Sequence, residues 1–173
     1  MSWVSAPQRK FLLLAVLSAL IPLSGCGYTP LYGSMDHDSK VTEAMQQVSV
    51  PTIGGGLVGL DVRNELLDSL GIEGSPIHPA QRLEVTVTPG LAGLLVQPDA
   101  AITRYNYTLV GSYKLVDSSS GKVLTQGSVY GESAYNVVAS QYATVVARRD
   151  AEKRAAQNVS EEIATRVAVY FKQ

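Results

Sequence analysis

The sequence predicts an α+β fold, a two-layer sandwich in which a four-stranded mixed sheet is covered by two helices, in the order β-α-β-β-β-α. Three stretches of alternating apolar and polar residues between positions 82 and 132 indicate half-buried strands. Two other stretches, around residues 58–70 and 138–171, repeat apolar residues at helical spacing. Because each of these elements has one apolar face, packing the helices on the sheet buries all of those faces together.

The first strand and the first helix are predicted from residues 46–70. Val48 and Val50 alternate with polar residues, which indicates a strand of about Gln46–Ile53. Gly54–Gly56 interrupts this strand, and Gly71 is a natural end for the helix that follows. The apolar stripe of that helix comprises Val58, Val62, Leu66 and Leu70. A β-α-β passage of this kind predicts parallel strands joined by a right-handed crossover.

The next three strands are predicted to form an antiparallel meander. Residues 82–88 alternate most clearly, and the strand continues to Val96 past a bulge near its glycines. Residues 97–100 form a turn, and a long strand follows over Ile102–Val116. Asp117–Gly121 is typical of a hairpin turn, and Lys122–Glu132 returns as the fourth strand.

The C-terminal segment, about Val138–Phe171, is predicted to be one long helix. Its apolar stripe is rich in alanine, so we expect the helix to approach its partners closely. The stripe comprises Val145, Ala155, Val159, Ile163, Val167 and Tyr170. The charged face carries Asp150–Arg154 and Glu162–Arg166, which have the i,i+4 spacing of favourable ion pairs.

The N-terminus has the organisation of an export signal. The basic pair at positions 9–10 precedes the apolar run Phe11–Ile21, and small residues follow up to Cys26, the only cysteine. This last part resembles the bacterial lipobox, which implies cleavage between Gly25 and Cys26 and a lipid on the cysteine sulfur. A transmembrane anchor is one alternative, but residues 11–23 would span only about 20 Å of a hydrocarbon core about 30 Å thick. A buried core helix with an ordinary free cysteine is the other, but it does not explain the N-terminal position, the basic flank and the small residues.

These features predict three parts: a signal peptide over residues 1–25, a lipidated N-terminus and tether over 26–44, and a single domain over 45–173. Cleavage removes Arg9 and Lys10, which leaves 12 basic residues against 15 acidic ones. The mature chain therefore lacks the basic surplus that nucleic-acid binding requires.

No catalytic site, metal site or cofactor other than the covalent lipid is predicted. Gly54, Gly56 and Gly59 match a dinucleotide-binding fingerprint, but Glu73, the candidate ribose-binding acid, falls in a loop rather than at the tip of a second parallel strand. His37 and His78 are the only histidines, and neither belongs to a nucleophilic triad or a zinc motif. We therefore interpret the glycines as a flexible strand-to-helix turn.

Several stretches in order resemble the LptE family of lipopolysaccharide-assembly lipoproteins, particularly its alphaproteobacterial branch. They cover essentially the whole mature chain: Cys26–Gly33, Val50–Ile53, Arg63–Leu67, Gln97–Asp99, Thr103–Tyr105, Gly121–Leu124, Ser133–Val138 and Tyr142–Thr144. The resemblance implies a fold of two helices on a four-stranded sheet. It also implies a non-enzymatic outer-membrane lipoprotein, held at the periplasmic face by its lipid anchor, that plugs and helps assemble the β-barrel LptD. Gly27 after the cysteine is compatible with sorting to the outer membrane.

The resemblance further implies contact with lipopolysaccharide on its way to the outer leaflet. Lipopolysaccharide carries phosphates, so a basic residue near a hairpin tip is the expected contact. The predicted tip at residues 97–99 has no base, and the nearest candidates are Arg104, then Lys114 and Lys122 on neighbouring strands. The alternative is an outer-membrane lipoprotein of the same fold that binds a different envelope partner and no barrel.

Overall fold

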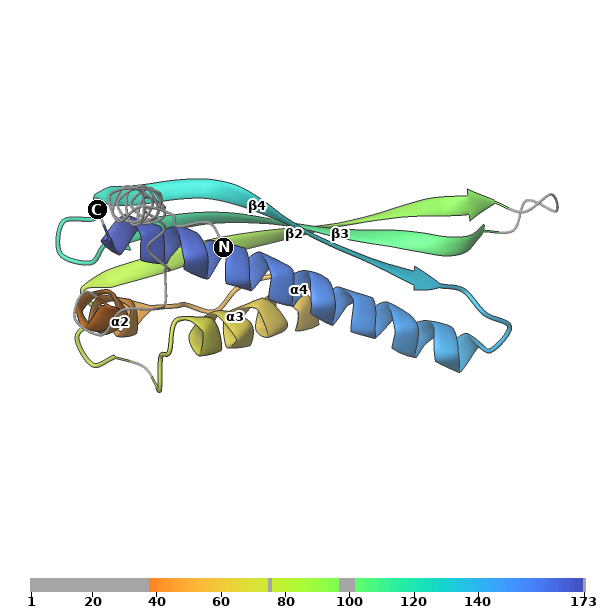
Figure 1. Ribbon diagram of the computed structural model, residues 1–173, viewed down its shortest axis with the longest axis horizontal. Coiled ribbons are helices and arrows are strands. Elements are labelled where there is room, and N and C mark those ends of the chain that lie inside the picture. The colour runs from red at the N-terminus through yellow and green to blue at the C-terminus, as the bar shows by residue number, and fades with distance from the viewer. Residues whose placement is uncertain (1–37, 75, 97–101, 173) are drawn as a thin grey trace, which may run out of the picture. The chain divides into compact units, whose positions relative to one another are not determined.

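The computed structural model describes residues 38–74, 76–96 and 102–172 (Figure 1). The predicted signal peptide, the cleavage site at Gly25–Cys26 and the lipidated cysteine lie outside the described residues. The described residues form one compact unit in which a four-stranded sheet, ordered β1-β2-β3-β4, is packed against helices. The elements follow the order α2-β1-α3-β2-β3-β4-α4, so the α+β two-layer prediction is confirmed, with one additional helix.

The additional helix lies where the sequence predicts the end of a tether. α2 spans Asp38–Gln46, and its Met45 side chain is buried. β1 is correspondingly short, Val48–Ser49 instead of residues 46–53. Val50 and Ile53 are nevertheless buried, so the segment after β1 contributes to the core without pairing in the sheet. Because α2 is mostly polar, its stability comes from the packing of Met45 in the core, and its sequence carries only a weak helical pattern.

α3 (Leu57–Ser69) connects β1 to β2, and these two strands are parallel as predicted. Val62 and Leu66 are fully buried on the predicted stripe, and Gly71 ends the helix with φ at 66°. A Cβ on Gly59 would lie 2.3 Å from the carbonyl oxygen of Gly54, so only glycine allows the helix to start this close to the preceding loop. The close packing of Gly59 against Gly54 is a structural reason for the glycines that match the dinucleotide-binding fingerprint.

The meander agrees closely with its prediction. β2 (Gln81–Val96), β3 (Ile102–Asp117) and β4 (Val123–Asn136) pair antiparallel, and β2 shifts register between Gly93 and Val96, where the bulge is predicted. In the β3–β4 turn, the Asp117 carboxylate accepts hydrogen bonds from the main-chain N–H groups of Ser119 and Ser120 at 3.1 and 2.7 Å. β4 runs four residues beyond its predicted end.

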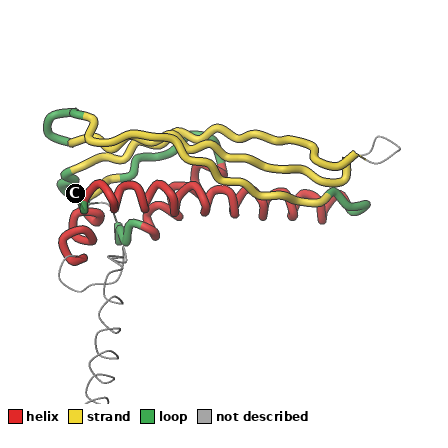
Figure 2. Tube along the Cα trace, turned by 45° about the horizontal axis from the view of Figure 1, so that its top comes forward, coloured by secondary structure: helices red, strands yellow, loops and turns green. Residues whose placement is uncertain are grey.

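α4 (Gln141–Phe171) covers the sheet face that β2–β4 turn towards the helices (Figure 2). Ser140 caps its N-terminus by accepting a hydrogen bond from the N–H of Ala143. A Cβ on Gly131 would lie 2.2 Å from the carbonyl oxygen of Ala155, so the helix and β4 are almost in backbone contact. The alanine-rich stripe is confirmed, but Val145 is 65% exposed. Val145 lies in the first turns of α4, which extend beyond the start of α3 (Figure 1).

Candidate functional site

The sheet has a second face that the described helices do not cover, and we call it the open face. Its side chains alternate along each strand with the buried ones, and most of them can form hydrogen bonds. The polar ones include Glu84, Thr86 and Thr88 on β2, Arg104, Asn106, Thr108, Ser112 and Lys114 on β3, and Gln126, Ser128, Tyr130 and Glu132 on β4, whereas Ala92, Val110 and Ala134 on the same face are apolar. The hydroxyls of Ser112 and Ser128 lie 3.1 Å apart across the strands. A polar surface of this extent is suited to binding a polar partner.

A shallow depression of about 450 Å³ lies on the open face around Lys114. In the strand register, Lys114 stands between Glu84 and Gln126. Glu84 forms an ion pair with Arg82 at 2.9 Å rather than with Lys114. Within the described part of the chain, no ion pair forms with Lys114, so its ammonium group is available to an anion.

The structure does not bring together the three cations predicted to contact lipopolysaccharide. Arg104 is exposed and lies near the start of β3, opposite Leu95 and Asn136. Lys114 lies ten residues further along the same strand, a separation of roughly 33 Å at about 3.3 Å per residue. Lys122 lies beyond the other end of β3, in the β3–β4 turn. Arg104 therefore lies far from the other two cations.

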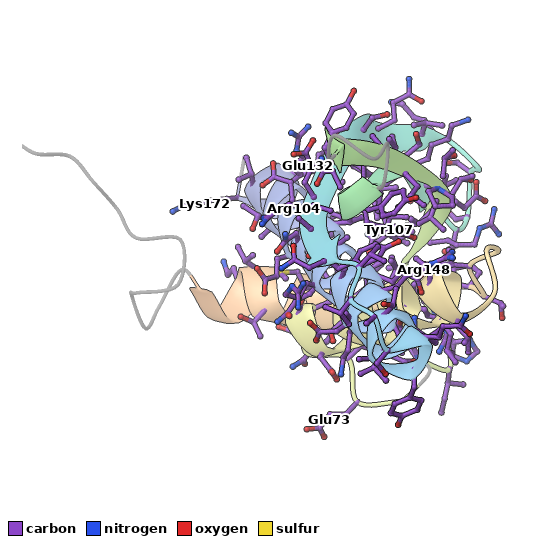
Figure 3. The ribbon with its side chains drawn as sticks, turned by 90° about the vertical axis from the view of Figure 1, so that its right-hand side faces the viewer. Glu73, Arg104, Tyr107, Glu132, Arg148 and Lys172 are labelled. Carbon is purple, nitrogen blue, oxygen red and sulfur yellow. The ribbon has the colours of Figure 1, made fainter. Side chains whose placement is uncertain are left out.

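We call the end of the sheet that carries Arg104 the distal end, and the end with the β3–β4 turn the proximal end. Figure 3 views the distal end and labels Arg104, Tyr107 and Arg148. On the covered face here, the rings of Tyr105 and Tyr135 stack with their centroids 5.6 Å apart, and Tyr107 is only 4% exposed. Burial raises the pKa of Tyr107 and of Tyr135 above the usual value of 10.0, so both phenols are neutral at physiological pH.

A network of charges joins α3 to α4 next to Tyr107. Arg149 pairs with Asp61 of α3 at 2.6 Å and with Glu152 at 3.6 Å, and Arg148 pairs with Glu152 at 2.9 Å. The spacing of Arg148 and Glu152 is an i,i+4 signal present in the sequence, although this pair is not among the predicted ones. The pair between Asp61 and Arg149 has no sequence signal, because its partners are 88 positions apart in different helices.

Both predicted helix pairs also form, Asp150 with Arg154 and Glu162 with Arg166.

Nothing in the described residues points to catalysis. Over residues 38–74, 76–96 and 102–172, no three histidine, cysteine or acidic side chains gather as metal ligands would. His78 is exposed in a loop, whereas His37 and Cys26 lie outside the described residues. In the same ranges, no helix is both long and apolar enough to cross a membrane.

Comparisons with known proteins agree with the fold and identify a family whose model matches this chain. The model of the LptE family, described as lipopolysaccharide-assembly, matches residues 45–167. The chain is 27% identical over 162 residues to the uncharacterized protein RP188 of Rickettsia prowazekii (strain Madrid E), a match that covers 93% of this chain and 97% of that protein.

Solved structures show the same architecture. A crystal structure described as a lipoprotein from Caulobacter crescentus CB15 superimposes with a TM-score of 0.65 at 18% identity, covering 77% of this chain and 96% of that one. A minor lipoprotein from Acinetobacter baumannii superimposes with a TM-score of 0.50 at 18% identity, covering 69% and 92%. At these identities the superpositions show a shared fold.

Proposed function

Because the chain belongs to the LptE family of non-enzymatic lipopolysaccharide-assembly lipoproteins of the outer membrane, we propose that it plugs and helps assemble an LptD-type outer-membrane β-barrel. The observation that carries this proposal is the open face: a four-stranded sheet with helices on one side and hydrogen-bonding side chains on the other. The lumen of an outer-membrane barrel is polar, so a plug needs a polar surface to lie against it.

The anchor in this proposal is a lipid on Cys26, formed after cleavage between Gly25 and Cys26. Residues 26–37 connect this cysteine to the start of α2. Several acyl chains hold a protein firmly at a membrane, whereas one holds it only marginally. The lipid would keep the domain at the periplasmic face of the outer membrane, within reach of the barrel lumen.

Arg104 is the proposed primary contact with lipopolysaccharide phosphates on their way to the outer leaflet. It is exposed at the distal end, beside the strand ends that lead into residues 97–101. Lys114 on the open face and Lys122 at the proximal turn are proposed as separate, weaker contacts, because they lie far from Arg104 along the sheet. Arg104→Glu should weaken photo-crosslinking to lipopolysaccharide more than Lys122→Glu does, and equal crosslinking in both variants would refute this assignment.

Co-purification tests the plug directly. Affinity-tagged protein extracted from outer membranes in mild detergent should carry a large β-barrel in stoichiometric amount. Cys26→Ser should lose the lipid adduct by mass spectrometry and give less of the complex. Recovery of a different envelope protein, with no barrel, would support the alternative of a lipoprotein with another partner.

A further inference from the structure

The outer edge of β4 is protected by α4 along only part of its length. β4 is the last strand of the described sheet, so one side of its backbone has no strand partner there. Near the distal end, Asn158 donates a hydrogen bond to the carbonyl oxygen of Glu132 at 3.4 Å, and Arg154 donates one to that of Ala134 at 3.2 Å. These two side chains satisfy edge carbonyls that would otherwise be available to another strand.

Towards the proximal end, the same edge is open. In an antiparallel strand, the N–H and C=O groups of one residue point to the same side, and successive residues alternate. β4 pairs with β3 in continuous register from Thr125 to Asn136. The main-chain groups of Gln126, Ser128 and Tyr130 therefore point away from β3, as the carbonyls of Glu132 and Ala134 do, but no described side chain caps them.

A groove of about 550 Å³ lies beside the Ser128–Tyr130 part of this open stretch, between β4 and α4. Ser128, Val129 and Tyr130 form the strand wall, and Asn158, Glu161, Glu162, Thr165 and Arg166 form the helix wall. Asn158 therefore both caps the protected half of the edge and lines the end of the groove. An edge strand facing a helix across a groove is the arrangement in which extended peptides are bound by β-augmentation.

The charge of the groove selects among possible occupants. Glu162 is paired with Arg166 at 2.9 Å, whereas no ion pair forms with Glu161 among the described residues. The helix wall therefore keeps one uncompensated carboxylate, which favours a lysine or arginine on the α4 side of an added strand. A second copy of the chain would bring an identical edge with its own Glu161, so like charges would meet.

We propose that the groove between β4 and α4 binds an extended, basic polypeptide segment of a partner protein, which adds as a fifth strand to the edge at Gln126–Tyr130. The main-chain groups of the open edge supply the affinity, and Glu161 supplies the preference for a basic segment. This inference goes beyond the plug proposal, and it is measured on the purified protein without any barrel, so the two can fail separately.

The test uses the full mature chain and a synthetic peptide of about eight residues in which lysine alternates with threonine and valine. Fluorescence anisotropy should detect binding of this peptide, and a counterpart with glutamate in place of lysine should bind at least about fivefold more weakly. Glu161→Gln should weaken binding of the lysine peptide about two- to fivefold. Gln126→Pro should weaken it about tenfold or more, because proline removes an edge donor.

Two matched variants separate the groove from general effects. Gln126→Ala removes the same side chain but keeps the N–H group, and should bind like the wild type. Leu91→Pro removes an edge donor from β2, at the opposite edge of the sheet, and should leave peptide affinity within about twofold. Circular dichroism checks that each variant is folded.

Three outcomes would overturn the proposal. The first is that neither peptide binds or that both bind equally well. The second is that Leu91→Pro reduces binding as much as Gln126→Pro does. The third is concentration-dependent dimerisation that Gln126→Pro abolishes, because it would identify a second copy as the occupant.

Discussion

The two ends of this sandwich bury their strands in different ways. At the proximal end, α3 and α4 together cover the sheet, and the contacts are mainly aliphatic: Leu66, Leu83, Leu115 and Ile163 are fully buried, and Tyr113 is the aromatic side chain among them. At the distal end, the covered face presents Tyr105, Tyr107 and Tyr135 to α4, and an ion-pair network connects α4 to the start of α3. The difference indicates that the proximal end provides most of the stability, while the distal end keeps its contacts polar.

The largest expected effect tests where the stability lies. Leu66→Ala removes a fully buried side chain from the proximal core and should lower the free energy of unfolding by about 2–5 kcal/mol. Leu91→Ala at the distal end, where the side chain is half exposed, should cost well under about 1 kcal/mol. Urea unfolding of both variants measures the contrast, and comparable losses would show that the ends do not differ as we describe.

The elements of the sandwich also differ in how well the sequence predicts them. The strands of the meander are predicted almost residue by residue, because strict alternation and the turn residues Asp117–Gly121 act locally. α2 is not predicted, because it becomes a helix through docking of Met45 and not through a strong pattern of its own. Val145 has the same apolar character as the buried positions of α4, and only the length of α3 leaves it exposed.

The candidate site shows the same limit. The alternation of polar and apolar residues predicts which side chains share the open face, because successive side chains of a strand point to opposite faces. The predicted bounds of the third strand also place Arg104 near its start and Lys122 beyond its end, so their separation follows from the length of that strand. Alternation does not predict the contacts that Arg154 and Asn158 make with β4, because these depend on where α4 crosses the sheet.

The next prediction concerns the point where α4 comes closest to the sheet. Gly131→Ala would place a Cβ 2.2 Å from the Ala155 carbonyl oxygen, so α4 must move, at a cost of about 1–3 kcal/mol. Gly90→Ala is the matched control, because the nearest atom to its added Cβ is 3.8 Å away. Gly90→Ala should be neutral or slightly stabilising. Thermal unfolding distinguishes the two, and equal melting temperatures would contradict the close approach.

A smaller effect is expected from the ion-pair network at the distal end. Asp61→Asn removes the charge that Arg149 faces across the two helices and should cost about 1 kcal/mol, between the values for exposed and buried pairs. Glu162→Gln, which breaks an exposed pair within α4, is the control and should cost less than about 0.5 kcal/mol. If both losses disappear in high salt to the same extent, Asp61 and Arg149 behave as an ordinary surface pair.

The smallest effect sharpens the comparison most, because the two ends should lose stability at opposite extremes of pH. At the proximal turn, hydrogen bonds from the hydroxyls and N–H groups of Ser119 and Ser120 lower the pKa of Asp117 from 3.8 to about 2. A carboxylate with a depressed pKa in the folded state stabilises it fully above its unfolded value, and this contribution is lost as pH falls through about 2. The stability difference between wild type and Asp117→Asn should therefore be constant above about pH 4 and shrink below it.

At the distal end the sign is reversed. Burial raises the pKa of Tyr107 and Tyr135, so the neutral phenol is the form that the folded state favours. The contribution is complete below the unfolded value of 10.0 and is lost as pH rises through the higher folded value. Phenolate absorbance reports tyrosine ionisation, and unfolding experiments at the same alkaline pH values report the free energy of unfolding. We expect Tyr107→Phe to lose less stability than the wild type as the pH rises, and Asp117→Asn to lose as much as the wild type. An alkaline profile unchanged by Tyr107→Phe would mean that ionisation of this buried phenol does not limit stability, and that the distal end owes its alkaline behaviour to other groups.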